Sequence, residues 1–350
     1  KASLNTGWKN PQKLLLGHSQ SSFLVEGDFD YYALLVPPQR DGNEPWESII
    51  LTLTPKNGGQ QDLYITTNSS REPGPKDYDI KSTNWGGLTP LVFSETAPGF
   101  CTDCTVYVGV YGYTSGYYSI VASQGLTRLQ EGFPQKGSVG GDNQKMYYEF
   151  FNPSGDLKPI QVVVTAITGD PDVYVTVGGS DLPGPHNFYW MGGASGTDFI
   201  EILPTDEHFC QDCFYEIGLT SAGNASFTVS ATGGDERATL LVHGRPQEGK
   251  VSAGGLRYYM VRPYSATSKL TVPLKLSSGS ADLFMVRMED DNTTTIDPMD
   301  ASTYSWTTKG LAVDTIVVQG EGPETGSSPY LIAVAGVTDA RFSVTATFSE

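Results

Sequence analysis

Three short stretches decide the fold of this chain: Asp62-Leu63-Tyr64-Ile65, Asp172-Val173-Tyr174-Val175 and Asp282-Leu283-Phe284-Met285. Each begins with an aspartate and continues with the β-branched, aliphatic and aromatic side chains that are typical of strands. They recur at equal intervals along the chain, and the interval matches the length of an ordinary small domain. The chain of 350 residues is therefore predicted to contain three copies of one domain.

Other features recur in the same order around these stretches. The aligned residues are Gly17, Gly132 and Gly244, then Gln20, Gln135 and Gln247, then the pairs Tyr31-Tyr32, Tyr147-Tyr148 and Tyr258-Tyr259, and downstream Trp85, Trp190 and Trp306. From these alignments we place an N-terminal arm at residues 1–11 and the three repeats at residues 12–123, 124–232 and 233–350.

The composition favours strands over helices. The chain has 40 Gly and 22 Pro, many at turns between short alternating runs, and only 17% charged residues. The clearest alternation covers residues 105–111, as expected of a strand with two different faces. We therefore predict an all-β fold.

The charge limits the partners that the chain can have. Its net charge is −17 and its pI is near 4.6, so its field repels nucleic acid and anionic lipid. No apolar run is long enough for a membrane span, and we predict a soluble chain without membrane insertion. No basic, apolar leader precedes Lys1, so a secreted form is expected to be the mature chain.

All four cysteines lie in two CxxC units at the same position of the first two repeats. The units are Phe100-Cys101-Thr102-Asp103-Cys104 and Phe209-Cys210-Gln211-Asp212-Cys213, and the third repeat has Gly326-Ser327-Ser328-Pro329 there. Because both cysteines of a unit are missing together, we predict disulfides between Cys101 and Cys104 and between Cys210 and Cys213. The alternatives are a zinc site, for which the two units would have to converge, and a redox motif, which requires a helix N-terminus.

Three N-x-S/T sequons agree with an oxidising, secretory compartment. They begin at Asn68, Asn224 and Asn292. Together with the paired cysteines, they predict a secreted glycoprotein of the extracellular space or the cell surface.

The repeat resembles the bacterial pre-peptidase C-terminal domain family. The segments Gly169-Asp170-Pro171-Asp172-Val173-Tyr174 and Val108-Gly109-Val110-Tyr111-Gly112 are similar to its motifs, and the resemblance covers residues 12–348 three times. It implies three tandem jelly-roll-like antiparallel β-sandwich domains that are secreted and non-catalytic. Such domains usually accompany a hydrolase and are thought to act in adhesion, substrate binding or passage to the cell surface. This chain departs from that setting, since no protease segment accompanies its repeats.

The sequence contains no recognised catalytic motif. The four histidines, which are His18, His186, His208 and His243, occur alone, and there is no HExxH, GxSxG, P-loop or GxGxxG pattern. We predict that the chain is not an enzyme, although a triad assembled from distant residues stays open.

The repeated aspartates allow two interpretations. An aspartate at a strand start can accept hydrogen bonds from the adjoining turn. Alternatively, Asp170 and Asp172 are candidates for calcium ligands, as are residues 289–291. Calcium is the only cofactor that the sequence suggests.

The aromatic residues make up 11% of the chain and also allow two interpretations. One tryptophan per repeat, at residues 85, 190 and 306, predicts a role in the core. The alternative is an exposed face that binds a glycan or a partner protein.

We therefore predict a secreted, non-enzymatic structural or adhesive protein, a subunit of an extracellular or cell-surface assembly such as a filament. The alternative is a carbohydrate- or matrix-binding region of a secreted hydrolase. Leu4 and Trp8 lie in the arm of residues 1–11, which is predicted to dock on the third repeat of the next subunit and so form a homopolymer. The arm could instead fold back on its own first repeat.

Overall fold

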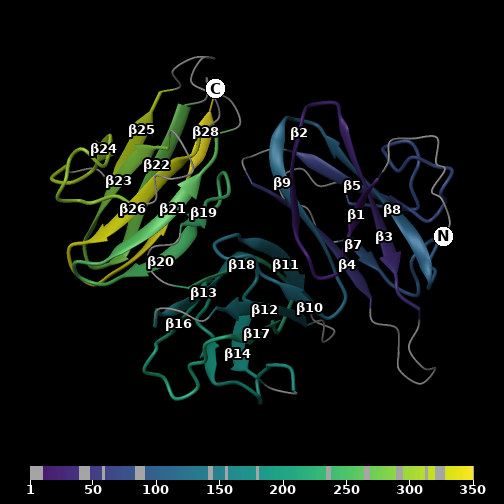
Figure 1. The fold of residues 1–350 in the computed structure, drawn as a ribbon, viewed down its shortest axis with the longest axis horizontal. Coiled ribbons are helices and arrows are strands. Elements are labelled where there is room, and N and C mark those ends of the chain that lie inside the picture. The colour runs from purple at the N-terminus through teal and green to yellow at the C-terminus, as the bar shows by residue number, and fades with distance from the viewer. Residues whose placement is uncertain are drawn as a thin grey trace. The chain divides into compact units, whose positions relative to one another are not determined.

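The structure of the protein is a computed structural model. It describes residues 11–38, 48–56, 60–82, 91–140, 145–153, 157–178, 181–233, 238–263, 269–288, 295–311, 314–319 and 328–349. Within these ranges every regular element is a β-strand, as Figure 1 shows, so the all-β prediction is confirmed. No helix in the described ranges is long and apolar enough to cross a membrane.

Each predicted repeat builds two sheets from its own strands, with the same strand order in every copy. In the first repeat one sheet has the order β1-β3-β8-β5-β6, made of Gln12–Leu14, Phe29–Val36, Cys104–Gly112, Gln61–Thr66 and Ile80–Ser82. The other sheet has the order β2-β9-β4-β7, made of Gln20–Leu24, Gly116–Ser123, Ile49–Pro55 and Leu91–Phe93. The two sheets bury their apolar faces against each other, as in a β-sandwich.

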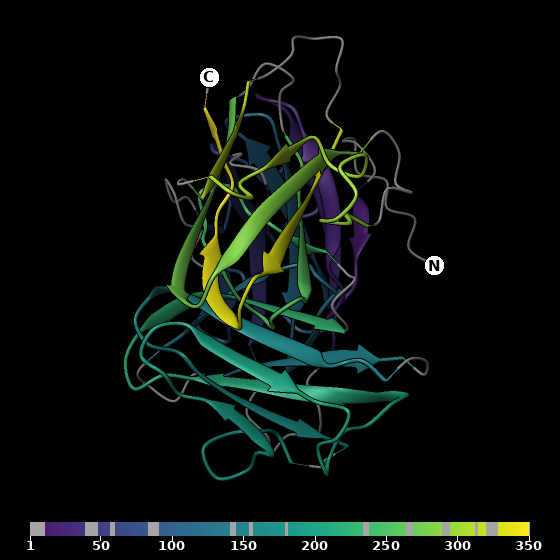
Figure 2. The ribbon, with the colours of Figure 1, turned by 90° about the vertical axis from the view of Figure 1, so that its left-hand side faces the viewer.

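The second repeat follows the same plan. One sheet has the order β10-β12-β17-β14-β15, made of Leu126–Arg128, Met146–Asn152, Cys213–Thr220, Asp172–Val177 and Trp190–Gly192. The other has the order β11-β18-β13-β16, made of Gln135–Val139, Ala225–Gly233, Ile160–Thr168 and Asp198–Ile202. In Figure 2 the strands of this repeat, drawn in teal, form two layers.

The third repeat has the same two sheets with one added strand. The first has the order β19-β21-β26-β23-β24, made of Thr239–Leu240, Leu256–Val261, Tyr330–Gly336, Ala281–Arg287 and Trp306–Thr307. The second has the order β20-β27-β22-β25, made of Gln247–Val251, Ala340–Val344, Lys269–Ser278 and Thr315–Val318, and β28 (Thr347–Ser349) also pairs with β22. The predicted β-sandwich fold is thus present in every repeat.

The chain divides into two compact units. One consists of Lys1–Pro55 and Gly59–Arg128, and the other of Lys56–Gly58 and Leu129–Glu350. The first unit holds both sheets of the first repeat. The second holds those of the second and third repeats, apart from the short strand β10.

The sheets depart from a purely antiparallel arrangement at one edge. The opening strand β1 pairs with β3 in the parallel sense, and β19 pairs with β21 in the same way. The parallel sense arises because the chain passes from this edge strand to the other sheet before it returns as β3 or β21.

The aligned opening glycines explain this crossing between sheets. Gly17, Gly132 and Gly244 all have a positive φ, at 75°, 71° and 68°, which side-chain-bearing residues rarely adopt. In each repeat the glycine N–H donates to a carbonyl near the end of the repeat, which belongs to Ala122, Ala231 and Ala346 respectively. The repeated glycine therefore fixes the turn that joins the two sheets.

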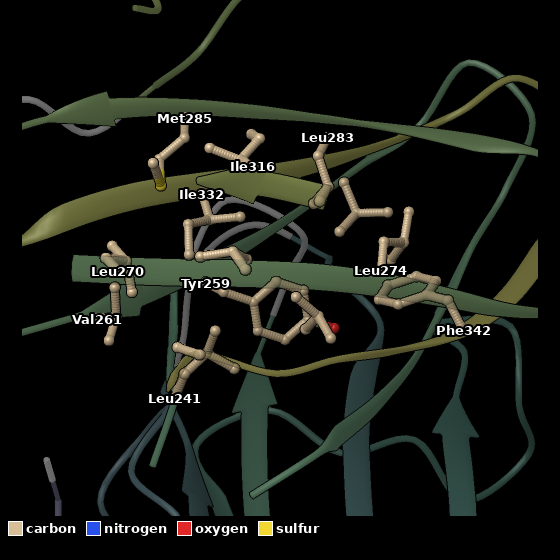
Figure 3. Packing of buried hydrophobic residues seen from close by; sticks show 14 of the residues in the cluster. Leu241, Tyr259, Val261, Leu270, Leu274, Leu283, Met285, Ile316, Ile332 and Phe342 are labelled. Atoms are coloured by element: carbon tan, nitrogen blue, oxygen red, sulfur yellow. The ribbon is translucent and has the colours of Figure 1, made fainter. Parts of the chain in front are cut away.

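The second tyrosine of each repeated pair lies in the core. Tyr32, Tyr148 and Tyr259 are almost completely buried between the two sheets. Tyr32 shares a hydrogen bond of 2.7 Å with the hydroxyl of Tyr118, and Tyr259 packs edge-on against Phe342. Figure 3 shows Tyr259 among the aliphatic side chains of the third core. Each fully buried aromatic or aliphatic side chain stabilises the fold by about 1.5–3 kcal/mol.

The first tyrosine of each pair begins a row across the opposite face of the five-stranded sheet. The rows are Tyr31-Gly109-Tyr64, Tyr147-Gly218-Tyr174 and Tyr258-Ala333-Phe284, with each residue directly beside the next on neighbouring strands. A loop crosses over every row. In the third repeat the Tyr258 hydroxyl donates to the Ile296 carbonyl at 3.0 Å and accepts from its N–H at 3.2 Å.

Candidate functional site

Both predicted disulfides are present. Cys101 is bonded to Cys104 and Cys210 to Cys213, each with Cα atoms 6.1 Å apart. Because each sulfur is bonded within its own unit, the described cysteines offer no thiolate for a shared zinc site. The two bonds indicate an oxidising environment for this protein.

The two disulfide loops share one backbone feature. Asp103 and Asp212, which precede the second cysteine, have φ values of 52° and 57°. In the second repeat the loop is held by Asn152, whose Nδ2 donates to the Cys210 carbonyl at 2.8 Å, and by the hydroxyl of Tyr215, which accepts from the Cys210 N–H at 2.8 Å. The loop thus enters β17 in a fixed direction.

The repeated aspartates act within their own repeats. Asp62 is buried beside the hydroxyl of Tyr64, which donates to its Oδ2 at 2.9 Å. Burial raises the pKa of the Asp62, Asp172 and Asp282 carboxyls, and for Asp172 the neighbouring charge of Asp170 raises the pKa further. The contact of Asp62 is with a side chain of its own strand, and the interpretation that these aspartates accept from the adjoining turn stays a prediction.

The calcium candidates have a third acidic neighbour that the sequence analysis missed. Asp198, at the start of β16, is 1% exposed, and no partner for its Oδ2 is found among the described residues. Burial, together with the charges of Asp172 and Asp170, raises the pKa of Asp198 to about 6.

The turn before Asp198 already donates to two of these carboxylates. Asp198 Oδ1 accepts from the Ala194 N–H at 2.8 Å, and Asp170 Oδ1 accepts from the Gly196 N–H at 2.6 Å. Among the described residues no group of three or more such side chains is placed to hold a metal ion, so calcium at Asp170 and Asp172 stays a prediction. Residues 289–291, the other calcium candidates, lie outside the described ranges.

Two of the three sequon asparagines are exposed. The Asn68 Oδ1 accepts hydrogen bonds from the N–H and the hydroxyl of Ser70, at 3.0 Å and 2.7 Å. Asn224 lies in the turn between β17 and β18, and Asn292 lies outside the described residues, as do Leu4 and Trp8 of the arm. Use of these sequons stays a prediction.

Three of the four histidines lie at separate surface positions or in the rim of a core. His18 and His186 are exposed. His243 is half-buried and accepts from the Phe348 N–H at 3.0 Å through Nδ1, and burial lowers its pKa. His243 also lies parallel to the ring of Phe348, with centroids 5.8 Å apart, whereas His208 stacks more closely on an exposed tyrosine, Tyr189.

The prediction of one equivalent tryptophan per repeat is wrong for the first repeat. Trp190 pairs with Val175 on the neighbouring strand, and Trp306 pairs with Met285. The residue of the first repeat that corresponds to Val175 and Met285 is Ile65, and it pairs with Ile80. Ile80 follows Asp62 at the same spacing as Trp190 follows Asp172, whereas Trp85 lies further along and outside the described ranges. The correct spacing is marked by a Pro-Gly-Pro loop that lies at the same distance after Asp62 and Asp172, at residues 73–75 and 183–185. The tryptophan alignment ignored this loop and therefore placed Trp85 too far along the chain. Trp190 and Trp306 are half-buried.

An aromatic surface of the second repeat surrounds Trp190. Tyr189 is 48% exposed, and its ring stacks on the imidazole of His208, with centroids 3.7 Å apart and planes 21° apart. Trp190 lies edge-on to both rings and donates from Nε1 to the Asp206 carboxylate at 3.0 Å. We call the set Tyr189, Trp190, Asp206 and His208 the tyrosine platform. The sequence analysis noted Trp190 and His208 separately but missed Tyr189 and Asp206.

Comparisons with known proteins identify no family for this chain. No family model matches it, and no curated protein matches it. Among solved structures, tripeptidyl peptidase 2 matches with a TM-score of 0.22 and 8% identity, over 96% of this chain and 32% of that protein. A protein described under "The Triple Jelly Roll Fold and Turret Assembly in an Archaeal Virus" matches with a TM-score of 0.20 and 10% identity, over 92% of this chain and 90% of that one.

Proposed function

We propose that this protein is a secreted, non-enzymatic structural or adhesive protein, a subunit of an extracellular or cell-surface assembly. The observation that carries the proposal is that one sandwich is built three times and that its recurring residues serve the scaffold in each copy. The opening glycines fix the crossing between sheets, the tyrosine rows support the covering loops, and the second tyrosines fill the cores. Three similar bodies in one chain suit a polymer or a multivalent adhesin.

The extracellular location is supported by two features. The disulfides are stable only where thiols are not kept reduced. The exposed positions of Asn68 and Asn224 are accessible to a glycosyltransferase.

The repeated architecture supports the proposal that the chain assembles into a homopolymer. Modules of one fold offer related surfaces at the two ends of the chain, and a head-to-tail contact between them either closes a ring or propagates as a filament. We propose that residues 1–11, through Leu4 and Trp8, dock on the third repeat of the next subunit by strand addition.

Light scattering combined with negative-stain electron microscopy tests this assembly. The full chain should form oligomers or fibres at high concentration, whereas a chain without residues 1–11 should remain monomeric. A second variant, Leu4→Ser with Trp8→Ser, keeps the length of the arm and removes only its two apolar anchors. If the full chain is monomeric at every concentration, the assembly proposal is wrong.

A second candidate function is a carbohydrate- or matrix-binding region of a secreted hydrolase. The tyrosine platform favours it, because an exposed aromatic ring held by its neighbours is suited to recognition. A monomer that binds a glycan and forms no assembly would support this second candidate over the first.

A further inference from the structure

We propose that the tyrosine platform binds a pyranose ring of a neutral glycan, with the sugar stacked on Tyr189 and its hydroxyls bonded to Asp206. The proposal deepens the adhesive function proposed above and names the ligand class of one of its surfaces.

The Tyr189 ring is held in place before any ligand arrives. The stack on His208 supports one of its faces, and the Tyr189 N–H donates to the Val175 carbonyl at 2.8 Å. Trp190 lies against both rings and packs in turn on the fully buried Tyr215, with ring centroids 5.9 Å apart. Because the ring is already ordered and half-exposed, little conformational entropy is lost when a ligand stacks on it.

The Asp206 carboxylate of the platform still has capacity to accept hydrogen bonds. Its Oδ2 accepts from Trp190 Nε1 and from the Leu203 N–H, both at 3.0 Å. No donor among the described residues reaches Oδ1. A pyranose combines a face of C–H groups with a rim of hydroxyl donors. The Tyr189 ring and the Asp206 carboxylate both contact Trp190, and the ring and the open carboxylate oxygen match these two parts of the sugar.

The other repeats show that the fold does not require this platform. In the first repeat Asp79 stands at the place of Tyr189, since its N–H donates to the Ile65 carbonyl as that of Tyr189 does to Val175. Gly99 stands there at the place of His208, and a Cβ on Gly99 would lie 3.1 Å from Asp79 Oδ2. In the third repeat the equivalent residue is Ser305, whose N–H donates to the Met285 carbonyl. An aspartate or a serine can make the same backbone hydrogen bond as Tyr189, so the fold does not need an aromatic residue at this position. The stack of Tyr189 on His208 therefore serves a purpose other than folding.

The charge of the chain argues against a second copy as the occupant. Asp206 belongs to the platform, the exposed Glu207 follows it in the chain, and the whole chain carries a net charge of −17. Two copies that met here would bring like charges together, which is unfavourable. A neutral glycan has no such cost.

The test is a titration of the full chain with four neutral hexasaccharides: chitohexaose, cellohexaose, xylohexaose and mannohexaose. Isothermal titration calorimetry should detect binding of at least one of them, with a Kd between about 10 µM and 1 mM. Tyr189→Ser, which introduces the residue of the third repeat, should weaken this binding about tenfold or more, as expected for the loss of a stacking platform. Asp206→Ala, which introduces the residue that the first repeat has at position 97, should also weaken it.

The matched control is Phe151→Ser, which removes another exposed aromatic ring of the same repeat. Phe151 is 39% exposed and lies on β12. In this sheet β17 and β14 separate β12 from β15, the strand that begins with Trp190. This variant should bind as the unchanged chain does, and circular dichroism should show that all three variants are folded.

The glycan proposal is overturned if none of the four sugars binds up to about 10 mM, or if Tyr189→Ser binds as well as the unchanged chain. It is also overturned if Tyr189→Ser abolishes self-association, because the platform would then be a contact between subunits. The assembly measurement is independent of the sugars, so failure of glycan binding leaves the structural function standing.

Discussion

The carbonyl of Pro183 lies directly over Gly218 of β17, so close that a side-chain carbon on Gly218 would overlap it. The first repeat has the same relationship between Pro73 and Gly109. In both repeats the glycine is the central member of a tyrosine row, and the Pro-Gly-Pro loop rests on it. In the second repeat this loop leads directly into Tyr189 and Trp190, so the glycine positions the loop that ends at the platform.

Gly218→Ala should therefore destabilise the second repeat. The added methyl group must displace the Pro183 backbone, and overpacking of this kind costs about 1–3 kcal/mol. Urea unfolding followed by circular dichroism measures the loss. The matched control is Gly223→Ala, where a Cβ meets no atom within 4 Å, and the change there should be within about 0.5 kcal/mol. Equal stability of the two variants would contradict this account of the loop.

Asp198 should make the second repeat less stable as the pH rises. Burial and the charges of Asp172 and Asp170 raise its pKa to about 6 in the folded chain, whereas an unfolded aspartate titrates near 3.9. The folded state therefore binds this proton more tightly. The stabilisation it gives is complete below about pH 4 and is lost as the pH rises to about 6.

Asp198→Asn removes this titration and keeps an acceptor for the Ala194 N–H. Above pH 6 the variant should be more stable than the unchanged chain by on the order of 1 kcal/mol. Unfolding midpoints measured at intervals from pH 4 to 8 test this, with Asp181→Asn as a control at an exposed aspartate of the same repeat. A constant difference between variant and unchanged chain over this range would show that Asp198 does not titrate there.

Removal of the Cys210–Cys213 bond should destabilise the second repeat without unfolding the chain. A bridge that closes so short a loop constrains the unfolded state by about 2 kcal/mol in the chain-entropy model. The double variant Cys210→Ser with Cys213→Ser should therefore keep its strand content and unfold at a lower urea concentration. The equivalent change at Cys101 and Cys104 is the comparison, and a loss of all structure in either variant would be inconsistent with a local role.

Asn68 should carry a glycan when the protein passes through a eukaryotic secretory pathway. Its side chain is exposed and already bonded to Ser70, the third residue of the sequon. Intact-mass spectrometry should give a mass above the 37.7 kDa of the chain. Ser70→Ala leaves Asn68 in place and should remove the glycan at this site, whereas Ser69→Ala should not. An unmodified Asn68 in the unchanged, secreted chain would refute this prediction.

The sequence by itself determined the features that depend on local spacing. The equal spacing of the repeats, the alternating strands and the CxxC units can all be read along the chain without knowledge of distant contacts. A disulfide within one CxxC unit needs no distant partner, and so the pairings of Cys101 with Cys104 and Cys210 with Cys213 could be predicted without a structure. The recurrence of Gly17, Gly132 and Gly244 can also be read along the chain, but the crossing between sheets that they fix appears only in the structure.

Only the tertiary structure decided which side chains meet across strands and loops. The sequence alignment paired Trp85 with Trp190, but the strand register gives Trp190 the place of Ile80. Asp198 and Asp172 are far apart along the chain, as are Tyr189 and His208, so neither relationship appears in local spacing. Asp172 on β14 and Asp198 on β16 belong to different sheets, and Tyr189 and His208 lie outside the strands, so the packing of the two sheets and their loops brings each pair together. The register that gives Trp190 the place of Ile80 likewise depends on loop lengths and on packing rather than on any one residue.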